Sequence, residues 1–148
     1  MTDVDRISGE VLDLSIRLHR DLGPGLLESV YETVLAGQLA RAGYEVDRQV
    51  SIDINYDGLH FAGAFRIDIL VENTLLIEIK SVDRVHAAHA KQLLIYLRLT
   101  GKPVGLLINF GGATLKEGFR GLVNGHGLSA PLPEQIEFGE RRCSTFQE

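Results

Sequence analysis

An acidic and a basic residue two positions apart, Glu78 and Lys80, form the stretch of this sequence best suited to chemistry. Alternate residues of a β-strand lie on the same face, so a strand here would present the carboxylate and the ammonium group together. Another carboxylate, Asp68, lies earlier in a stretch that also alternates. Paired carboxylates are the hard oxygen ligands that Mg²⁺ prefers, and a neighbouring lysine can stabilise negative charge that develops during a reaction.

A β-hairpin would bring these groups together. Apolar and polar residues alternate over 61–71, which predicts a half-buried strand, and a second apolar run covers 75–79. The connection Glu72-Asn73-Thr74 has a common hairpin-loop length, and Asn73 tolerates the left-handed conformation that such loops need. We therefore predict a hairpin with a three-residue loop.

The register of this hairpin decides which side chains meet. A three-residue loop places Asp68 opposite Glu78 and Arg66 opposite Lys80, with all four side chains on one face. A two-residue loop would put the apolar residues of the two strands on opposite faces, so the longer loop is favoured. Directly opposite Cβ atoms lie roughly 5 Å apart, where like charges repel unless something lies between them. A divalent cation is the natural candidate.

Plainer interpretations compete with a metal site. Asp68, Glu78 and Lys80 could form an ion network that only stabilises the sheet, and the residues alone favour this reading over a metal site. His86 and His89, three positions apart, imitate a metal-binding pair. Zinc, however, needs a third protein ligand and often a thiolate, which the neighbouring sequence lacks.

Composition narrows the class of protein. The chain of 148 residues suits one domain, in which a single core buries about two thirds of the unfolded surface. Its 45% apolar and 24% charged residues are typical of a soluble globular protein, and its formal net charge of −5 argues against non-specific coating of nucleic acid. The sequence lacks a membrane-length apolar run and a basic secretory leader, so we expect a cytoplasmic protein. Cys143, the single cysteine, is expected to be an incidental surface thiol.

The rest of the chain must supply the elements that hold these groups. The segment Gly23-Pro24-Gly25 should separate the first two helices. A helix between two strands implies a right-handed crossover to a parallel partner. In chain order we predict helices over 4–20 and 26–42, strands over 44–56, 61–71 and 75–79, a helix over 85–99, a buried strand over 102–110, a strand or helical turn over 115–123, and a short strand over 135–138.

Two of the predicted helices carry polar residues at helical spacing. Glu28 and Tyr31 lie on one side of the second helix, where Glu28 suits the helix dipole and Tyr31 suits a core position with a satisfied hydroxyl. On the third helix His89, Gln92 and Tyr96 share one face. A polar stripe of that kind on an otherwise apolar helix needs partners.

Five motifs in order resemble the GxxExxY family of the PD-(D/E)xK nuclease superfamily. They are Gly25-x-x-Glu28-x-x-Tyr31, Phe65-x-x-Asp68, Glu78-Ile79-Lys80, His89-x-x-Gln92-x-x-x-Tyr96-Leu97 and Leu106-Leu107-Ile108-Asn109-Phe110-Gly111. The resemblance covers residues 25–124. It implies an α/β fold with a restriction-endonuclease-like core, in which a helix, three antiparallel strands, a helix and a strand form a mixed sheet flanked by helices. The domain would span 1–125, followed by a partly loosely ordered C-terminal extension over 126–148.

The resemblance also implies a metal centre. Asp68, Glu78 and the main-chain carbonyl of Ile79 correspond to the superfamily's metal ligands, for Mg²⁺ or Mn²⁺. Glu28 corresponds to an additional acid that the first core helix offers. The proline of the superfamily's name is Ile67 here, a departure we expect to be harmless because proline shapes the backbone and holds no ligand.

Further roles come from the same resemblance. Lys80 matches the lysine that activates the attacking water or stabilises developing charge, and Gln92 matches a helix residue that supports the site. Tyr31, His89 and Tyr96 belong to the family pattern without a defined chemical role.

The function implied is hydrolysis of phosphodiester bonds in DNA or RNA by a metal-dependent nuclease. The alternative is a non-catalytic module of the same fold that binds nucleic acid or a protein partner. A small acidic nuclease could rely on a second copy of itself or on another protein to hold its substrate, and no membrane contact is expected. Four basic residues are candidates for phosphate contacts: Arg48, Arg66, Arg84 and Lys91.

Overall fold

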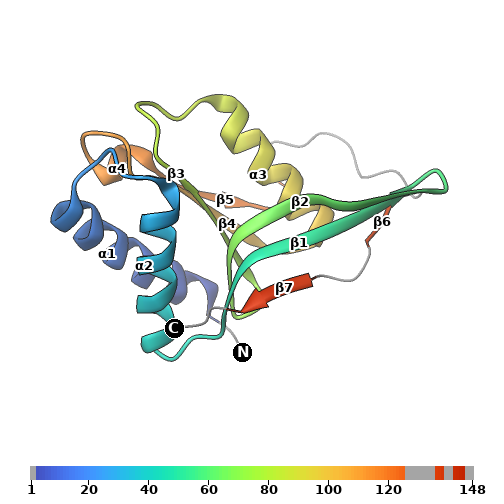
Figure 1. Cartoon of the computed structure of the whole chain (residues 1–148), viewed down its shortest axis with the longest axis horizontal. Coiled ribbons are helices and arrows are strands. Elements are labelled where there is room, and N and C mark those ends of the chain that lie inside the picture. The colour runs from blue at the N-terminus through green and yellow to red at the C-terminus, as the bar shows by residue number, and fades with distance from the viewer. Residues whose placement is uncertain (1–2, 126–135, 139–141, 146–148) are drawn as a thin grey trace.

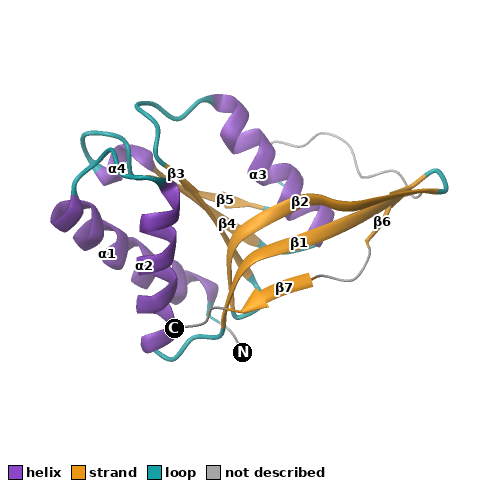
Figure 2. Cartoon of the chain, viewed as in Figure 1, coloured by secondary structure: helices purple, strands orange, loops and turns teal. Residues whose placement is uncertain are grey.

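The computed structural model describes residues 3–125, 136–138 and 142–145, and the statements below concern these residues. One mixed sheet separates α1 and α2 from α3 (Figures 1 and 2). The elements are α1 (Val4–Leu22), α2 (Glu28–Arg41), β1 (Val46–Tyr56), β2 (Leu59–Val71), β3 (Leu75–Lys80), α3 (Ala87–Thr100), β4 (Val104–Asn109), α4 (Leu115–Gly118), β5 (Phe119–Val123), β6 (Ile136–Phe138) and β7 (Arg142–Thr145). Among these residues, none of the helices combines the length and apolarity needed to span a bilayer.

Local signals explain where the first helices begin and end. Asp3 caps α1, since its side chain accepts a hydrogen bond from the main chain of Arg6 at 3.1 Å. The predicted break between the helices is confirmed, because Gly23 and Gly25 take backbone φ angles of 75° and 99° that favour glycine. The helix α2 begins at Glu28, two residues later than predicted.

The sheet has the strand order β5-β4-β3-β2-β1-β6, and β7 also pairs with β1. The strands β1, β2 and β3 are antiparallel neighbours, whereas β3 and β4 are parallel and connected through α3. The predicted fold class is thereby confirmed: a helix, three antiparallel strands, a helix and a parallel strand. The segment 115–123, predicted as a strand or a helical turn, contains both a short helix, α4, and a strand, β5.

The C-terminal part of the chain adds two strands to the outer edge of β1. The predicted strand over 135–138 corresponds to β6, and β7 was not predicted because Arg142–Thr145 shows little alternation of apolar residues. The expectation of a loosely ordered extension falls mostly on residues 126–135, 139–141 and 146–148, which lie outside the described residues.

The hairpin of β2 and β3 has the predicted register. Val71 pairs with Leu75 across the three-residue loop, and Asn73 takes the expected left-handed conformation, with a φ of 53°. The ladder between these strands then ends at the pair Ile69–Ile77, within the described residues. The predicted pairing of Arg66 with Lys80 is therefore wrong: Arg66 pairs with Ser51 of β1, and Lys80 pairs with Asn109 of β4.

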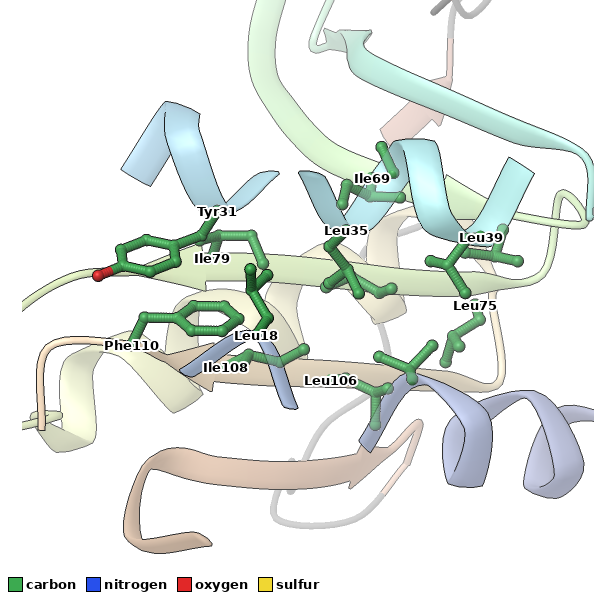
Figure 3. Packing of buried hydrophobic residues seen from close by; sticks show 14 of the residues in the cluster. Leu18, Tyr31, Leu35, Leu39, Ile69, Leu75, Ile79, Leu106, Ile108 and Phe110 are labelled. Carbon is green, nitrogen blue, oxygen red and sulfur yellow. The ribbon is translucent and has the colours of Figure 1, made fainter. Parts of the chain in front are cut away.

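Two apolar clusters cover the two faces of the sheet. The cluster on the side of α1 and α2 includes Leu35, Ile79 and Phe110, and Figure 3 shows how helix and strand side chains meet there. The cluster on the side of α3 includes Leu93 and Leu76. Both faces of β3 and β4 are buried, which explains why these strands read as continuous apolar runs.

The long hairpin of β1 and β2 extends past α3 in Figure 1. Along β2, alternate apolar side chains pack first in the cluster with α3 and then in the cluster with α1 and α2. Ile69 belongs to the cluster with α1 and α2, whereas Ile67, two residues earlier, belongs to the cluster with α3. Residues two apart in a regular strand share a face, so the change occurs at Asp68. The residue opposite, Gln49, has a left-handed backbone with a φ of 51°.

Candidate active site

Asp68 and Glu78 meet where β2 separates from β3. The Asp68 Oδ2 atom accepts a hydrogen bond from the Ile79 main-chain N–H at 2.9 Å, and Glu78 Oε1 accepts one from the Asp68 N–H at 3.3 Å. These reciprocal side-chain bonds continue the connection between the strands beyond the last ladder pair, Ile69–Ile77. The two carboxylates are consequently held side by side, as the predicted register requires.

Burial of this pair strongly affects its protonation. Burial, followed by the negative charge of Asp68, raises the pKa of Glu78 to about 8, although the bond from the Asp68 N–H and the charge of Lys80 oppose the shift. Burial likewise raises the pKa of Asp68, against the bond that it accepts from the Ile79 N–H. Without a cation, the site thus favours a proton on Glu78 at neutral pH.

The charges of Lys80 and Glu28 also act at this position. Lys80, the last residue of β3, lowers the pKa of Asp68, of Glu78 and of His89 through its positive charge. Glu28, exposed at the first position of α2, raises the pKa of Glu78 and opposes the lowering of the His89 pKa. The fold therefore brings both predicted residues into the electrostatic neighbourhood of the carboxylate pair.

Tyr31 sets the position of the loop that leads into α2. Its hydroxyl donates a hydrogen bond to the Gly23 carbonyl at 2.5 Å and accepts one from the Leu26 N–H at 3.2 Å. Its ring stacks on Phe110 with centroids 4.4 Å apart (Figure 3). On the other side, the Ser81 hydroxyl donates to the Leu26 carbonyl at 2.6 Å. The start of α2 is thus tied both to the core and to the residue that follows Lys80.

The helix α3 contributes the other side of the site. Tyr96 stacks on Phe65 with ring centroids 4.3 Å apart, and its pKa is raised by burial first and then by the charges of Glu78 and Asp68. The pKa of His89 is lowered by burial, by Lys80 and by His86. The Nδ1 atom of His89 accepts a hydrogen bond from the His86 main-chain N–H at 3.2 Å, which satisfies a donor at the start of the helix.

Gln92 lies on the same helix between His89 and Tyr96, and its side chain is exposed. Within the described residues, its amide makes no hydrogen bond to Asp68, Glu78 or Lys80. The structure thus places Gln92 on the helix that faces the site, without a hydrogen bond to these three side chains in the described part of the chain.

The sequence did not single out Gln49 of β1, which bonds to Asp68 and links it to a buried acid of α2, Glu32. The Gln49 amide nitrogen donates to Asp68 Oδ1 at 3.3 Å and to Glu32 Oε1 at 2.5 Å. Glu32 is only 5% exposed and forms an ion pair with Arg48, whose Nη2 lies 2.6 Å from Glu32 Oε2. Arg48, which is also a predicted candidate for a phosphate contact, binds this buried acid.

The donor set suits a hard divalent cation. Asp68, Glu78 and the carbonyl of Ile79 would supply oxygen ligands, which Mg²⁺ and Mn²⁺ prefer. In the described part of the chain, no group of three His, Cys, Asp or Glu side chains is arranged to hold a metal ion. A metal bound by two carboxylates would therefore complete its shell with main-chain oxygen and water, as Mg²⁺ commonly does.

Comparison with known families gives one assignment. The family model of the PD-(D/E)XK nuclease superfamily matches residues 5–122, a span from α1 into β5 that contains the whole site. No curated protein and no solved structure matches the chain. Nucleases of this superfamily act on nucleic acid and generally use divalent metal ions.

Proposed function

Because this chain belongs to the PD-(D/E)XK nuclease superfamily, we propose that it hydrolyses phosphodiester bonds of DNA or RNA with the help of Mg²⁺ or Mn²⁺. The observation that carries the proposal is a pair of carboxylates, buried Glu78 and half-buried Asp68, that hydrogen bonds hold side by side next to Lys80. Within the superfamily we assign the chain to the GxxExxY family, on the order of its five motifs.

We assign the metal ligands to Asp68, Glu78 and the main-chain carbonyl of Ile79. A divalent ion held there would polarise a phosphate oxygen and lower the pKa of a bound water. Glu28 would add a further acid from the start of α2, where its charge already acts on Glu78. The hydrogen bonds of Asp68 and Glu78 to the main chain keep both carboxylates oriented before any substrate arrives.

The positive charge of the site comes from Lys80. Its ammonium group acts on both carboxylates and lies at the end of β3, where it can stabilise negative charge on a reacting phosphate. A neutral Lys80 amine could alternatively take the proton of the attacking water. Gln92, exposed on α3, would support the site by hydrogen bonding to substrate or water.

Cleavage assays with site variants test this function. The purified chain should cleave members of a panel of single- and double-stranded DNA and RNA only when Mg²⁺ or Mn²⁺ is present. Glu78→Ala and Lys80→Ala should each lose activity by at least about 100-fold, with an unchanged circular dichroism spectrum. Glu45→Ala and Lys116→Ala remove an exposed acid and an exposed base elsewhere, and should retain activity.

Two outcomes would contradict the proposal. Activity of the Glu78 and Lys80 variants equal to that of the natural chain would show that another site, or a contaminant, cleaves the substrate. A chain that shows no heat of binding with millimolar Mn²⁺ in calorimetry would favour the alternative, a non-catalytic module that binds nucleic acid or a protein.

A further inference from the structure

Gln49 lies between two carboxylates that belong to different elements. Its amide nitrogen donates one hydrogen bond to Glu32 Oε1 on α2 and another to Asp68 Oδ1 on β2, at 2.5 and 3.3 Å. A primary amide nitrogen carries two hydrogen atoms, so this one neutral group can serve both acids. The side chain thereby joins a buried acid of the helix to a proposed metal ligand of the sheet.

The backbone at Gln49 supports a specific role for this side chain. Its φ of 51° is left-handed, a conformation that costs free energy for a residue other than glycine. It occurs in the middle of β1, at the position where the strand pair changes sides relative to the helices. Strained backbone of this kind persists where the surrounding structure enforces it, often at functional sites.

The partner on the other side of Gln49 is itself rigidly held. Arg48 donates from Nε and Nη2 to Glu32 Oε2, at 3.0 and 2.6 Å, and from Nη2 to the Thr33 hydroxyl at 2.9 Å. Glu32 is 5% exposed, so its carboxylate is shielded from water. Both Arg48 nitrogens bond to the same oxygen, Oε2, and the other oxygen, Oε1, accepts from Gln49, so each oxygen of Glu32 has a donor. Glu32 therefore provides a fixed point from which Gln49 reaches Asp68.

We propose that Gln49 is a positioning residue for the metal ligand Asp68, an inference that rests on the proposed function. With Oδ1 bonded to Gln49 and Oδ2 bonded to the Ile79 N–H, both oxygens of Asp68 have a fixed donor. These bonds set the rotation of the carboxylate and leave its remaining lone pairs for a cation. Gln49 itself would touch neither metal nor substrate.

Binding of Mn²⁺ tests this role independently of activity. The free Mn²⁺ in a titration is measured by its electron paramagnetic resonance signal, with full-length protein. Gln49→Leu, which keeps the size of the side chain and removes both donors, should weaken Mn²⁺ binding by about 10- to 100-fold. Gln38→Leu, the same substitution on α2 outside the site, should bind Mn²⁺ as the natural chain does.

A second variant separates positioning from a contribution to folding. Gln49→Gly removes the same donors but accepts the left-handed backbone, so its melting temperature should match or exceed that of Gln49→Leu. A positioning role predicts weak Mn²⁺ binding in both variants, whatever their stability. Unchanged Mn²⁺ affinity in either folded variant would overturn the inference while leaving the nuclease proposal intact. Failure of the natural chain to bind Mn²⁺ would overturn both.

Discussion

At the scale of single residues, the pair of Asp68 and Glu78 combines burial with like charge. Burial and then the charge of Asp68 raise the pKa of Glu78, whereas burial and then the charge of Glu32 raise the pKa of Asp68. A cation between them would remove the repulsion. Ionisation of both carboxylates is unfavourable in this environment when no metal is bound. The same environment favours binding of a divalent ion, because the ion neutralises the two charges.

The raised pKa of Glu78 predicts how stability depends on pH in the absence of metal. The pKa moves from an ordinary value of 4.5 to about 8 on folding, so between these values the folded chain holds a proton that the unfolded chain releases. The stabilisation that the protonated Glu78 gives the folded chain is fully present below pH 4.5 and is lost as the pH rises through about 8. We expect the free energy of unfolding to fall by a few kcal/mol over this window, on the order set by the linkage relation.

Urea unfolding across this pH range, in buffer with a chelator, measures the effect. Glu78→Gln keeps a neutral side chain at every pH and should show a flatter profile than the natural chain. Parallel profiles for the two proteins would contradict the raised pKa. Asp68 contributes in the same direction and remains in both proteins, so the difference between the profiles reports Glu78 together with its effect on the neighbouring Asp68.

At the scale of elements, the loop after β4 fits closely against the connector that follows β3. A Cβ atom at Gly111 would lie 2.4 Å from the Val82 carbonyl oxygen, whereas one at Gly112 would meet its nearest neighbour at an ordinary 3.6 Å. Asn109 also bonds to the main chain of Val82, through both its side-chain oxygen and its side-chain nitrogen. The ends of β3 and β4, and with them Lys80, are therefore locked together by this contact.

Gly111→Ala should separate these strand ends. The clash is with backbone atoms that cannot rotate away, so we expect a loss of stability of about 1–3 kcal/mol, typical of overpacking. Chemical denaturation measures the loss, and Gly112→Ala is the matched control with little expected effect. A Gly111 variant as stable as the Gly112 variant would show that the loop has room to move.

The hairpin of β2 and β3 could be predicted from the sequence in its register, but not in the way its faces pack against the helices. Alternation and loop length were sufficient to place Asp68 beside Glu78, since only one register buries the apolar residues of both strands on common faces. The sequence could not predict that the strand pair turns from one apolar cluster to the other at Gln49, because apolar residues keep the same alternation before and after this position. Alternation of apolar residues predicts which side chains share a face of the strand, but it does not predict which helix packs against that face.

The residues missed by the sequence share a physical reason. A glutamate in a helix and a glutamine in a strand each have an ordinary solvated interpretation. Glu32 and Gln49 acquire a role only through contact across 17 positions of sequence. The ion pair of Arg48 with Glu32 could not be predicted for the same reason, because this buried partner belongs to another element.

At the scale of the whole molecule, the site is assembled from segments that span most of the matched region. The start of α2, the first half of β1, the place where β2 and β3 separate, and the face of α3 all contribute charges or hydrogen bonds. The connection through α3 makes β3 and β4 parallel neighbours, so the site depends on a crossover as well as on local hairpins. Its geometry is a property of the complete fold.

The strands β6 and β7 have a consequence for the molecule in solution. They pair with β1 along Ile54–Tyr56 and at Asp47, Arg48 and Ser51, and both lie beyond residue 122, where the superfamily match ends. Without them the outer edge of β1 would offer unpaired N–H and C=O groups to other chains, a template for self-association. A chain cut after Gly125 should therefore form larger oligomers or aggregates than the full chain at the same concentration, a difference that light scattering detects. A shortened chain that scatters light no more strongly than the full chain, per mass of protein, would show that pairing with β6 and β7 is not what keeps this edge from self-association.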